Sequence, residues 1–139
     1  MPVAARAALS VVILLIGACP DRETRRIAGD YCLDRWFDGQ SYDITGCGWF
    51  PKLRGTTDNG PMEGTIEQLG WDRRYIVARR IPLFKVDGEG WMVLDTERET
   101  LSELYPNEAW ARRRQAPDVA NITTYPVKEA WDRLGHEDR

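Results

Sequence analysis

The feature that most constrains this chain is an apolar run near its start, residues 7–18, which ends directly before a cysteine. Every residue of the run except Ser10 is apolar, and Arg6 is the charge that precedes it. The run falls short of the roughly 20 residues that a membrane-spanning helix needs, but it has the length of the hydrophobic segment of a secretory signal. The pattern therefore predicts that residues 1–18 are a cleaved signal peptide and that residues 27–139 fold as a single small globular domain.

The last residues of this run, Ile16-Gly17-Ala18-Cys19, resemble the lipobox of bacterial lipoproteins. In that family a peptidase cuts before the cysteine, and the cysteine sulfur carries a diacylglycerol. The resemblance implies that Cys19 is lipidated and that the chain is anchored in the cell membrane, facing the periplasm or the cell exterior. Residues 19–26 are then a polar tether. Two alternatives stay open, a buried N-terminal element of a cytosolic protein and an uncleaved membrane anchor.

Two further cysteines, Cys32 and Cys47, form an even pair once Cys19 carries lipid. In an oxidising compartment such a pair favours a disulfide, and closing a loop of about 15 residues stabilises a fold by roughly 3 kcal/mol. Two buried free thiols are the alternative. Two cysteines and the distant His136 do not complete a tetrahedral ligand set, so we expect neither a metal site nor a cofactor.

Turn signals and residue patterns predict an α+β fold. Twelve glycines and eight prolines suit a turn-rich, mainly β chain. Hydrophobic alternation predicts strands at residues 27–37, 42–46, 66–69, 75–78, 83–86, 91–95 and 101–104. Helices are expected at residues 106–115, with Asn107 as a cap, and at residues 126–134, with one apolar stripe. The expected architecture is an antiparallel β-meander with two short C-terminal helices packed on it.

Two stretches of the expected meander carry a second resemblance. Residues 65–79 (TIEQLGWDRRYIVAR) and 90–96 (GWMVLDT) are similar to a pattern in small uncharacterised bacterial lipoproteins, which also have an N-terminal lipobox. This resemblance implies an envelope location and a β-rich fold. It implies no activity.

The chain lacks sequence signatures of catalysis. Its net charge of −3 argues against a nucleic-acid partner. Nucleophile elbows, Ser-x-x-Lys motifs and phosphate-binding glycine loops are absent. The carboxylate pairs Asp34/Asp38 and Asp95/Glu97 suit acid–base chemistry only within a cleft, and we expect them in turns or on the surface.

Tryptophan is abundant, with six residues, and core packing accounts for most of them. Trp49 and Trp71 lie in turn-like sequence and are the candidates for an exposed surface that binds a glycan or a peptide. The sequence thus favours a lipid-anchored envelope protein with a non-enzymatic binding or scaffolding role. Its expected partners are the membrane, through the lipid, and another envelope protein or a cell-wall component.

Two other functions remain as alternatives. One is an inhibitor of a cell-wall hydrolase, similar to the lipoprotein-type lysozyme inhibitors: Tyr31-Cys32 matches their start loosely, but their Ser-Gly-x-Arg-Tyr loop is missing. The other is an envelope hydrolase, which predicts a carboxylate with a perturbed pKa in a cleft.

Overall fold

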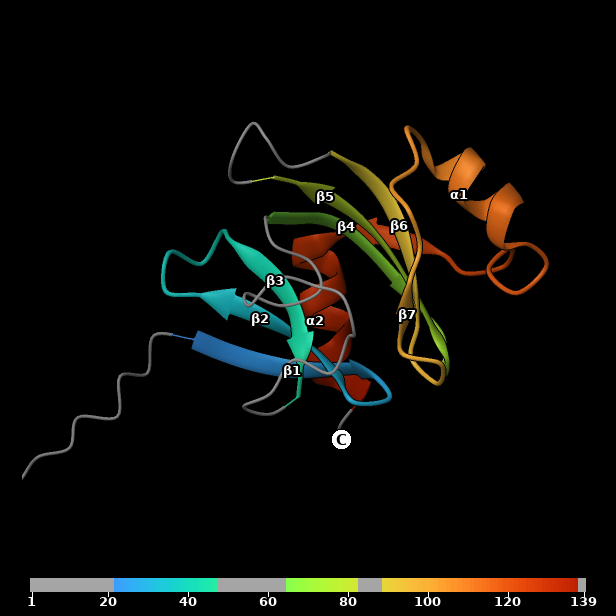
Figure 1. The fold of residues 1–139 in the computed structure, drawn as a ribbon. Coiled ribbons are helices and arrows are strands. Elements are labelled where there is room, and N and C mark those ends of the chain that lie inside the picture. The colour runs from blue at the N-terminus through green and yellow to red at the C-terminus, as the bar shows by residue number, and fades with distance from the viewer. Residues whose placement is uncertain (1–21, 48–64, 83–88, 138–139) are drawn as a thin grey trace, which may run out of the picture.

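The computed structural model describes residues 22–47, 65–82 and 89–137. The elements follow the order β1 (Arg22–Ala28), β2 (Tyr31–Trp36), β3 (Tyr42–Gly46), β4 (Thr65–Trp71), β5 (Tyr75–Ile81), β6 (Gly90–Asp95), β7 (Thr100–Leu101), α1 (Glu108–Gln115), β8 (Thr124–Pro126) and α2 (Val127–Glu137). The strands form two antiparallel sheets, β1-β2-β3 and β7-β6-β5-β4-β8 (Figure 1). The predicted α+β fold with two C-terminal helices is confirmed.

The turn between β2 and β3 is fixed by one aspartate. The Asp38 carboxylate accepts hydrogen bonds from the backbone N–H groups of Gln40 and Ser41, both at 2.8 Å, and from the Ser41 hydroxyl at 2.5 Å. Gly39 takes a φ of +65°, which favours glycine. This is the turn that the Asp-Gly pair predicts.

The disulfide follows from this hairpin. The register pairs Tyr31 with Gly46 and Cys32 with Thr45, so the chain returns to the start of β2 as β3 ends. Cys47 comes next and is bonded to Cys32, with their Cα atoms 5.1 Å apart. The predicted disulfide is confirmed.

The larger sheet contains the predicted meander, because β4, β5, β6 and β7 pair in sequence order. The late strand β8, which the sequence analysis did not predict, adds to the outer edge of β4 and pairs Leu69 with Tyr125. The helix expected at residues 126–134 begins one residue later, at Val127, directly after β8. The chain therefore passes from the sheet edge straight into α2.

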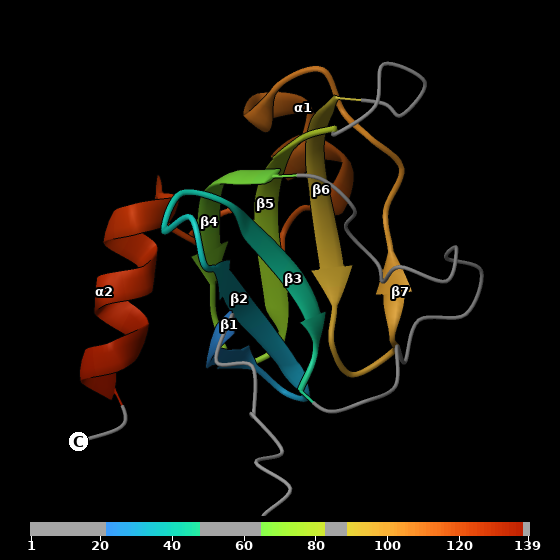
Figure 2. The same cartoon turned by 90° about the vertical axis from the view of Figure 1, so that its left-hand side faces the viewer.

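Two hydrophobic clusters divide the molecule into layers. The larger one lies between the two sheets and includes the predicted stripe of α2, which runs along one side of the stacked sheets (Figure 2). Its members on α2 are Val127, Ala130, Trp131 and Leu134. The smaller cluster covers the opposite face of the larger sheet, where Ala111 of α1 and Val119 and Ile122 of the following segment pack on Val77 and Val93.

The structure corrects the predicted tether. Residues 22–26 belong to β1, which pairs with β2 from Arg22 opposite Trp36 onward. The side chains of this half-strand are polar and mostly exposed, which is typical of an edge strand. Arg25 also packs its guanidinium over the Trp131 ring, 4.2 Å from the ring centroid, and donates to the Trp131 carbonyl at 2.5 Å. The segment from 27 to 37 accordingly splits into the end of β1, a turn and β2.

The remaining predictions vary in outcome. Asn107 caps α1 as expected, since its side chain accepts a hydrogen bond from the Trp110 N–H at 3.0 Å. The strand expected at 101–104 is shorter and earlier, at Thr100–Leu101. The strand expected at 83–86 lies outside the described residues. Within the described part of the chain, neither helix is long and apolar enough to cross a bilayer.

Candidate functional site

The β4–β5 turn forms the centre of the candidate site. Asp72 accepts hydrogen bonds from the backbone N–H groups of Arg74 and Tyr75, both at 2.7 Å, and its own N–H donates to the Tyr75 carbonyl. Aspartate favours such turns because its short carboxylate mimics a backbone acceptor. The turn-like sequence around Trp71 does form a turn, but at residues 72–74, with Trp71 as the last residue of β4 and Tyr75 as the first residue of β5.

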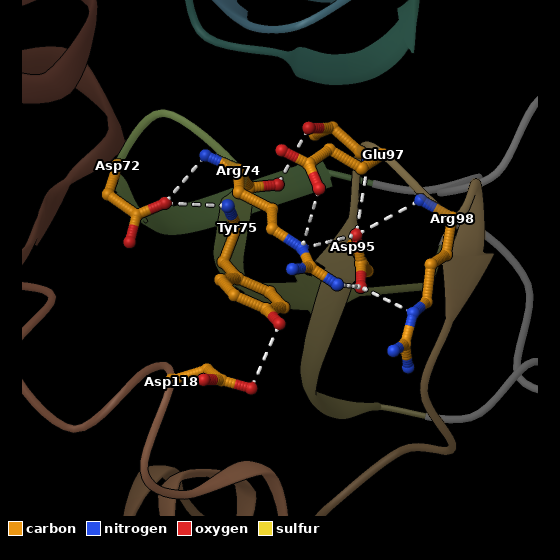
Figure 3. A network of polar contacts seen from close by, with 8 residues as sticks. Asp72, Arg74, Tyr75, Asp95, Glu97, Arg98 and Asp118 are labelled. Atoms are coloured by element: carbon orange, nitrogen blue, oxygen red, sulfur yellow. Dashed lines mark hydrogen bonds and ion pairs between the residues drawn. The ribbon is translucent and has the colours of Figure 1, made fainter.

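A bidentate ion pair lies beside this turn (Figure 3). Arg74 donates from Nε and Nη2 to the two Asp95 oxygens, at 3.0 and 2.7 Å. Asp95 also accepts from the backbone N–H groups of Glu97 and Arg98, both at 3.1 Å. The Arg74 side chain, and secondarily these backbone donors, lower the pKa of Asp95 below its usual value, and the pairing raises the pKa of Arg74.

Tyr75 joins the turn to the segment after α1. Its hydroxyl donates to Asp118 Oδ2 at 2.9 Å, and the Arg74 guanidinium lies over its ring, 4.9 Å from the centroid (Figure 3). Burial, followed by the hydrogen bond to Asp118, raises the pKa of Tyr75. The hydroxyl therefore stays protonated and remains a hydrogen-bond donor at neutral pH.

A cavity of about 480 Å³ opens next to Trp71. Its aromatic part is Trp71 and Tyr125, whose ring centroids lie 6.2 Å apart at an interplanar angle of 58°. Its polar part comes from three segments of the chain, the β4–β5 turn, the segment between α1 and β8, and α2, which contribute Asp72, Asp118, Asn121, Thr123 and Arg133. We call this cavity the Trp71 cleft. Its size falls within the range of small-molecule sites in proteins.

Arg133 is held over the aromatic part of the cleft. Its guanidinium lies 3.9 Å from the Tyr125 ring centroid, and its Nη2 is 2.8 Å from Glu129 Oε1 one helical turn earlier. The hydrogen bond with Glu129 raises the pKa of Arg133. The cleft therefore presents a fixed positive charge beside two aromatic rings.

The segment that supplies Asp118 and Asn121 is fixed by α1. Arg112 donates to the carbonyls of Val119 at 2.8 Å and Ile122 at 2.5 Å, and it is paired with Glu108. Arg112 therefore has a structural role at the end of α1, because its guanidinium binds the loop carbonyls. The signal that sequence analysis overlooked is the Glu108–Arg112 spacing of four residues.

Asp118 also lines a second cavity, of about 290 Å³, on the other side of its hydrogen bond with Tyr75. Asp95, Arg98, Ser102 and Gln115 contribute polar side chains to this second cavity. Asp118 therefore lines both the Trp71 cleft and this second cavity.

The structure brings together only some of the predicted site residues. Trp71 lines the cleft but is only partly exposed, and among the described residues the exposed tryptophans are Trp36 and Trp110. Cys19 and Trp49 lie outside the described residues. Within the described residues, no group of three or more His, Cys, Asp or Glu side chains is arranged to hold a metal ion.

The carboxylate pairs named from the sequence do not face one another across a cleft. Asp34 is fully buried in β2, whereas Asp38 lies in the exposed turn, where the Ser41 hydroxyl lowers its pKa. Asp95 and Glu97 both contact Arg74. The pKa shifts of Asp38 and Asp95 are downward, the direction opposite to that of a general acid at neutral pH.

Comparison of the chain with protein-family models, with curated proteins and with solved structures gives no match.

Proposed function

We propose that this chain is a lipid-anchored domain of the bacterial envelope that binds a saccharide of the cell wall without cleaving it. The anchor is a diacylglycerol on Cys19, and the binding site is the Trp71 cleft. The observation that carries the proposal is the composition of this cleft, in which an aromatic pair faces carboxylate, amide, hydroxyl and guanidinium groups.

The chemistry of the cleft suits a sugar ring. The C–H face of a pyranose is apolar and packs on an aromatic ring, while its hydroxyl groups both donate and accept hydrogen bonds. Trp71 and Tyr125 supply the aromatic surface, and Asp118 and Asn121 supply acceptors and donors from a segment that Arg112 holds in place. An extended peptide would instead pair with a sheet edge, and the edge beside the cleft is β8, a strand of three residues that offers few backbone partners.

The carboxylates of the cleft are already engaged within the fold, which supports binding rather than hydrolysis. Asp72 accepts from the backbone N–H groups of Arg74 and Tyr75, and Asp118 accepts from the Tyr75 hydroxyl. Tyr31 bears on the alternative of a hydrolase inhibitor: its side chain is fully buried, so the Tyr31-Cys32 start contributes no ring to an inhibitory surface.

The test is co-sedimentation of the purified Cys19→Ser chain with peptidoglycan sacculi, followed by calorimetry with soluble glycan fragments. Asn121→Ala and Trp71→Ala should each weaken binding at least about tenfold, because each removes a contact worth 1.4 kcal/mol or more. Trp110→Ala is the matched control, since Trp110 is exposed on α1 and does not line the cleft. Equal affinity for all four chains would refute the cleft as the saccharide site.

A further inference from the structure

The tip of the β2–β3 hairpin carries two exposed aromatic side chains. Phe37 is 81% exposed and Trp36 is 38% exposed. A soluble domain gains nothing from an exposed phenylalanine, and single exposed hydrophobic residues occur on many surfaces. Here two aromatic residues are adjacent, and the place where they lie in the fold gives them a common explanation.

The tip lies beside the point where the chain enters the domain. Strand pairing puts Arg22, the first residue of β1, opposite Trp36. The start of β1 and the β2–β3 turn lie at the same end of the molecule, and α1 lies at the other end (Figure 1). Arg22 is three residues after Cys19, and three residues span at most about 11 Å.

This corrected tether changes the geometry of the proposed anchor. A tether that extended to residue 26 would let the domain tumble above the bilayer, whereas the three positions from Cys19 to Arg22 hold the hairpin tip at the headgroup layer. Tryptophan is enriched at that layer because its ring has an apolar body and a polar N–H, and phenylalanine contributes to the apolar face of segments that lie at the same depth.

Hydrogen bonds and an ion pair also hold the tip and the residues beside it. Asp38 fixes the turn, and the Trp36 indole N–H donates to Asp43 Oδ2 at 2.6 Å. Next to Trp36 on β2, Arg35 pairs with Glu23 of β1 at 2.6 Å. The tip therefore offers an apolar contact rather than a cationic one.

We propose that Trp36 and Phe37 form a membrane-contact site that docks the hairpin tip into the headgroup region of the bilayer. This inference rests on the proposed lipid anchor at Cys19. It fixes the orientation of the domain, with β1 and the hairpin toward the membrane. The occupant of the tip is the lipid surface itself, and the aromatic contact is independent of the Trp71 cleft.

The experiment uses the full chain, matured and lipidated in cells, in vesicles of phosphatidylethanolamine and phosphatidylglycerol that contain a phosphatidylcholine brominated high on its acyl chains. Bromine quenches tryptophan emission at contact. Vesicles should quench part of the wild-type emission, and Trp36→Phe should remove most of that quenched part. Trp110→Phe is the matched control: it removes a tryptophan of similar exposure, 45%, at the other end of the molecule and should leave the quenched part intact.

A second variant tests the partner residue. Phe37→Asp should lower the quenching of Trp36 at least twofold without loss of folding, because the Phe37 side chain is almost entirely solvent-exposed. Quenching should also persist at high salt, since the contact is apolar. Equal quenching in wild type and Trp36→Phe overturns the proposal, as does quenching that Phe37→Asp leaves unchanged.

Intact mass separates this inference from the proposed function. A chain without the diacylglycerol refutes the anchor. In that case the Cys19 thiol is coupled to a maleimide lipid in the same vesicles, and the three variants still decide whether the hairpin tip contacts the bilayer.

Discussion

Each of the two sheets contains a buried aspartate, and the two carboxylates accept hydrogen bonds from different kinds of donor. Asp34, in the small sheet, is fully buried and accepts hydrogen bonds from the hydroxyls of Thr24 and Thr45, both at 2.7 Å; Arg22 lies further away, at 3.3 Å. Asp95, in the large sheet, is 8% exposed and is bound bidentately by Arg74.

The difference follows from what each aspartate holds together: strands in the small sheet and a turn in the large one. The small sheet has three strands, with β1 at one edge and β3 at the other, and only part of β1 is buried. Asp34 joins its two neighbouring strands through hydroxyl groups, and the disulfide closes the same hairpin covalently. The large sheet is covered on both faces by hydrophobic clusters. Its aspartate at the end of β6 fixes a turn beside the cleft rather than the sheet itself.

Removal of the disulfide, which closes the hairpin of the small sheet, should have the largest effect on stability. Cys32→Ala/Cys47→Ala, compared in a Cys19→Ser background, should lower the free energy of unfolding by about 3 kcal/mol, because the unfolded chain regains the freedom of a loop of about 15 residues. Urea unfolding measures the loss. Hydrogen exchange should accelerate in β1–β3 more than in β4–β6. Uniform acceleration in both sheets would show that they unfold as one unit.

Asp34→Ala should have the next largest effect and lower the free energy of unfolding by about 2 kcal/mol, because the part-buried hydrogen bonds from the Thr24 and Thr45 hydroxyls lose their shared acceptor. Glu23→Ala is the control: Glu23 lies on the adjacent strand in an exposed pair with Arg35, and its loss should cost less than about 0.5 kcal/mol. Urea unfolding of both variants at neutral pH makes the comparison. Equal losses of unfolding free energy in the two variants would contradict the stabilising role assigned to the buried Asp34 carboxylate.

The sequence predicted those parts of the fold that depend on local patterns. The Asp38-Gly39 turn, the polar turn after Trp71, the Asn107 cap and the apolar stripe of α2 each depend on residues a few positions apart, and each is present. The disulfide was predictable because two cysteines flank one hairpin. Local turn chemistry and hydrophobic periodicity are reliable because their physical causes are local.

The errors have non-local causes. Residues 22–26 are too polar to look like a strand, and they form one because β2 offers backbone partners and Trp131 offers a ring for Arg25. The short strand β8 exists because the edge of β4 was free for residues far along the chain.

The cleft was predicted only through Trp71. Asp118, Asn121, Tyr125 and Arg133 reach it from other segments of the chain, and no spacing in the sequence relates them to the β4–β5 turn. Arg112 holds the segment that carries Asp118 and Asn121, because it donates to the backbone carbonyls of Val119 and Ile122. A contact with backbone carbonyls leaves no pattern of residue types in the sequence. A site assembled by side chain-to-backbone contacts is therefore the part of such a domain that sequence analysis is least able to find.

The smallest expected effect is the dependence of stability on acid pH, which tests the ion pair of Asp95 in the large sheet. Because Arg74 lowers the pKa of Asp95 in the folded state, the folded chain binds fewer protons there than the unfolded chain below about pH 4, so this stabilisation is lost as the pH falls through the folded pKa. Asp95→Asn should be less stable than wild type at pH 7, and the gap should narrow toward pH 3 in urea unfolding.

Glu97→Gln is the control for this acid experiment, since Glu97 is exposed and lies 3.4 Å from the same guanidinium. Its stability should follow the wild type throughout, because solvent screens an exposed pair. A gap for Asp95→Asn that stays constant with pH would mean that the backbone N–H groups of Glu97 and Arg98 hold the turn through hydrogen bonds alone. The two sheets would then use the same kind of contact, a carboxylate held by neutral donors, and the contrast between them would reduce to the disulfide.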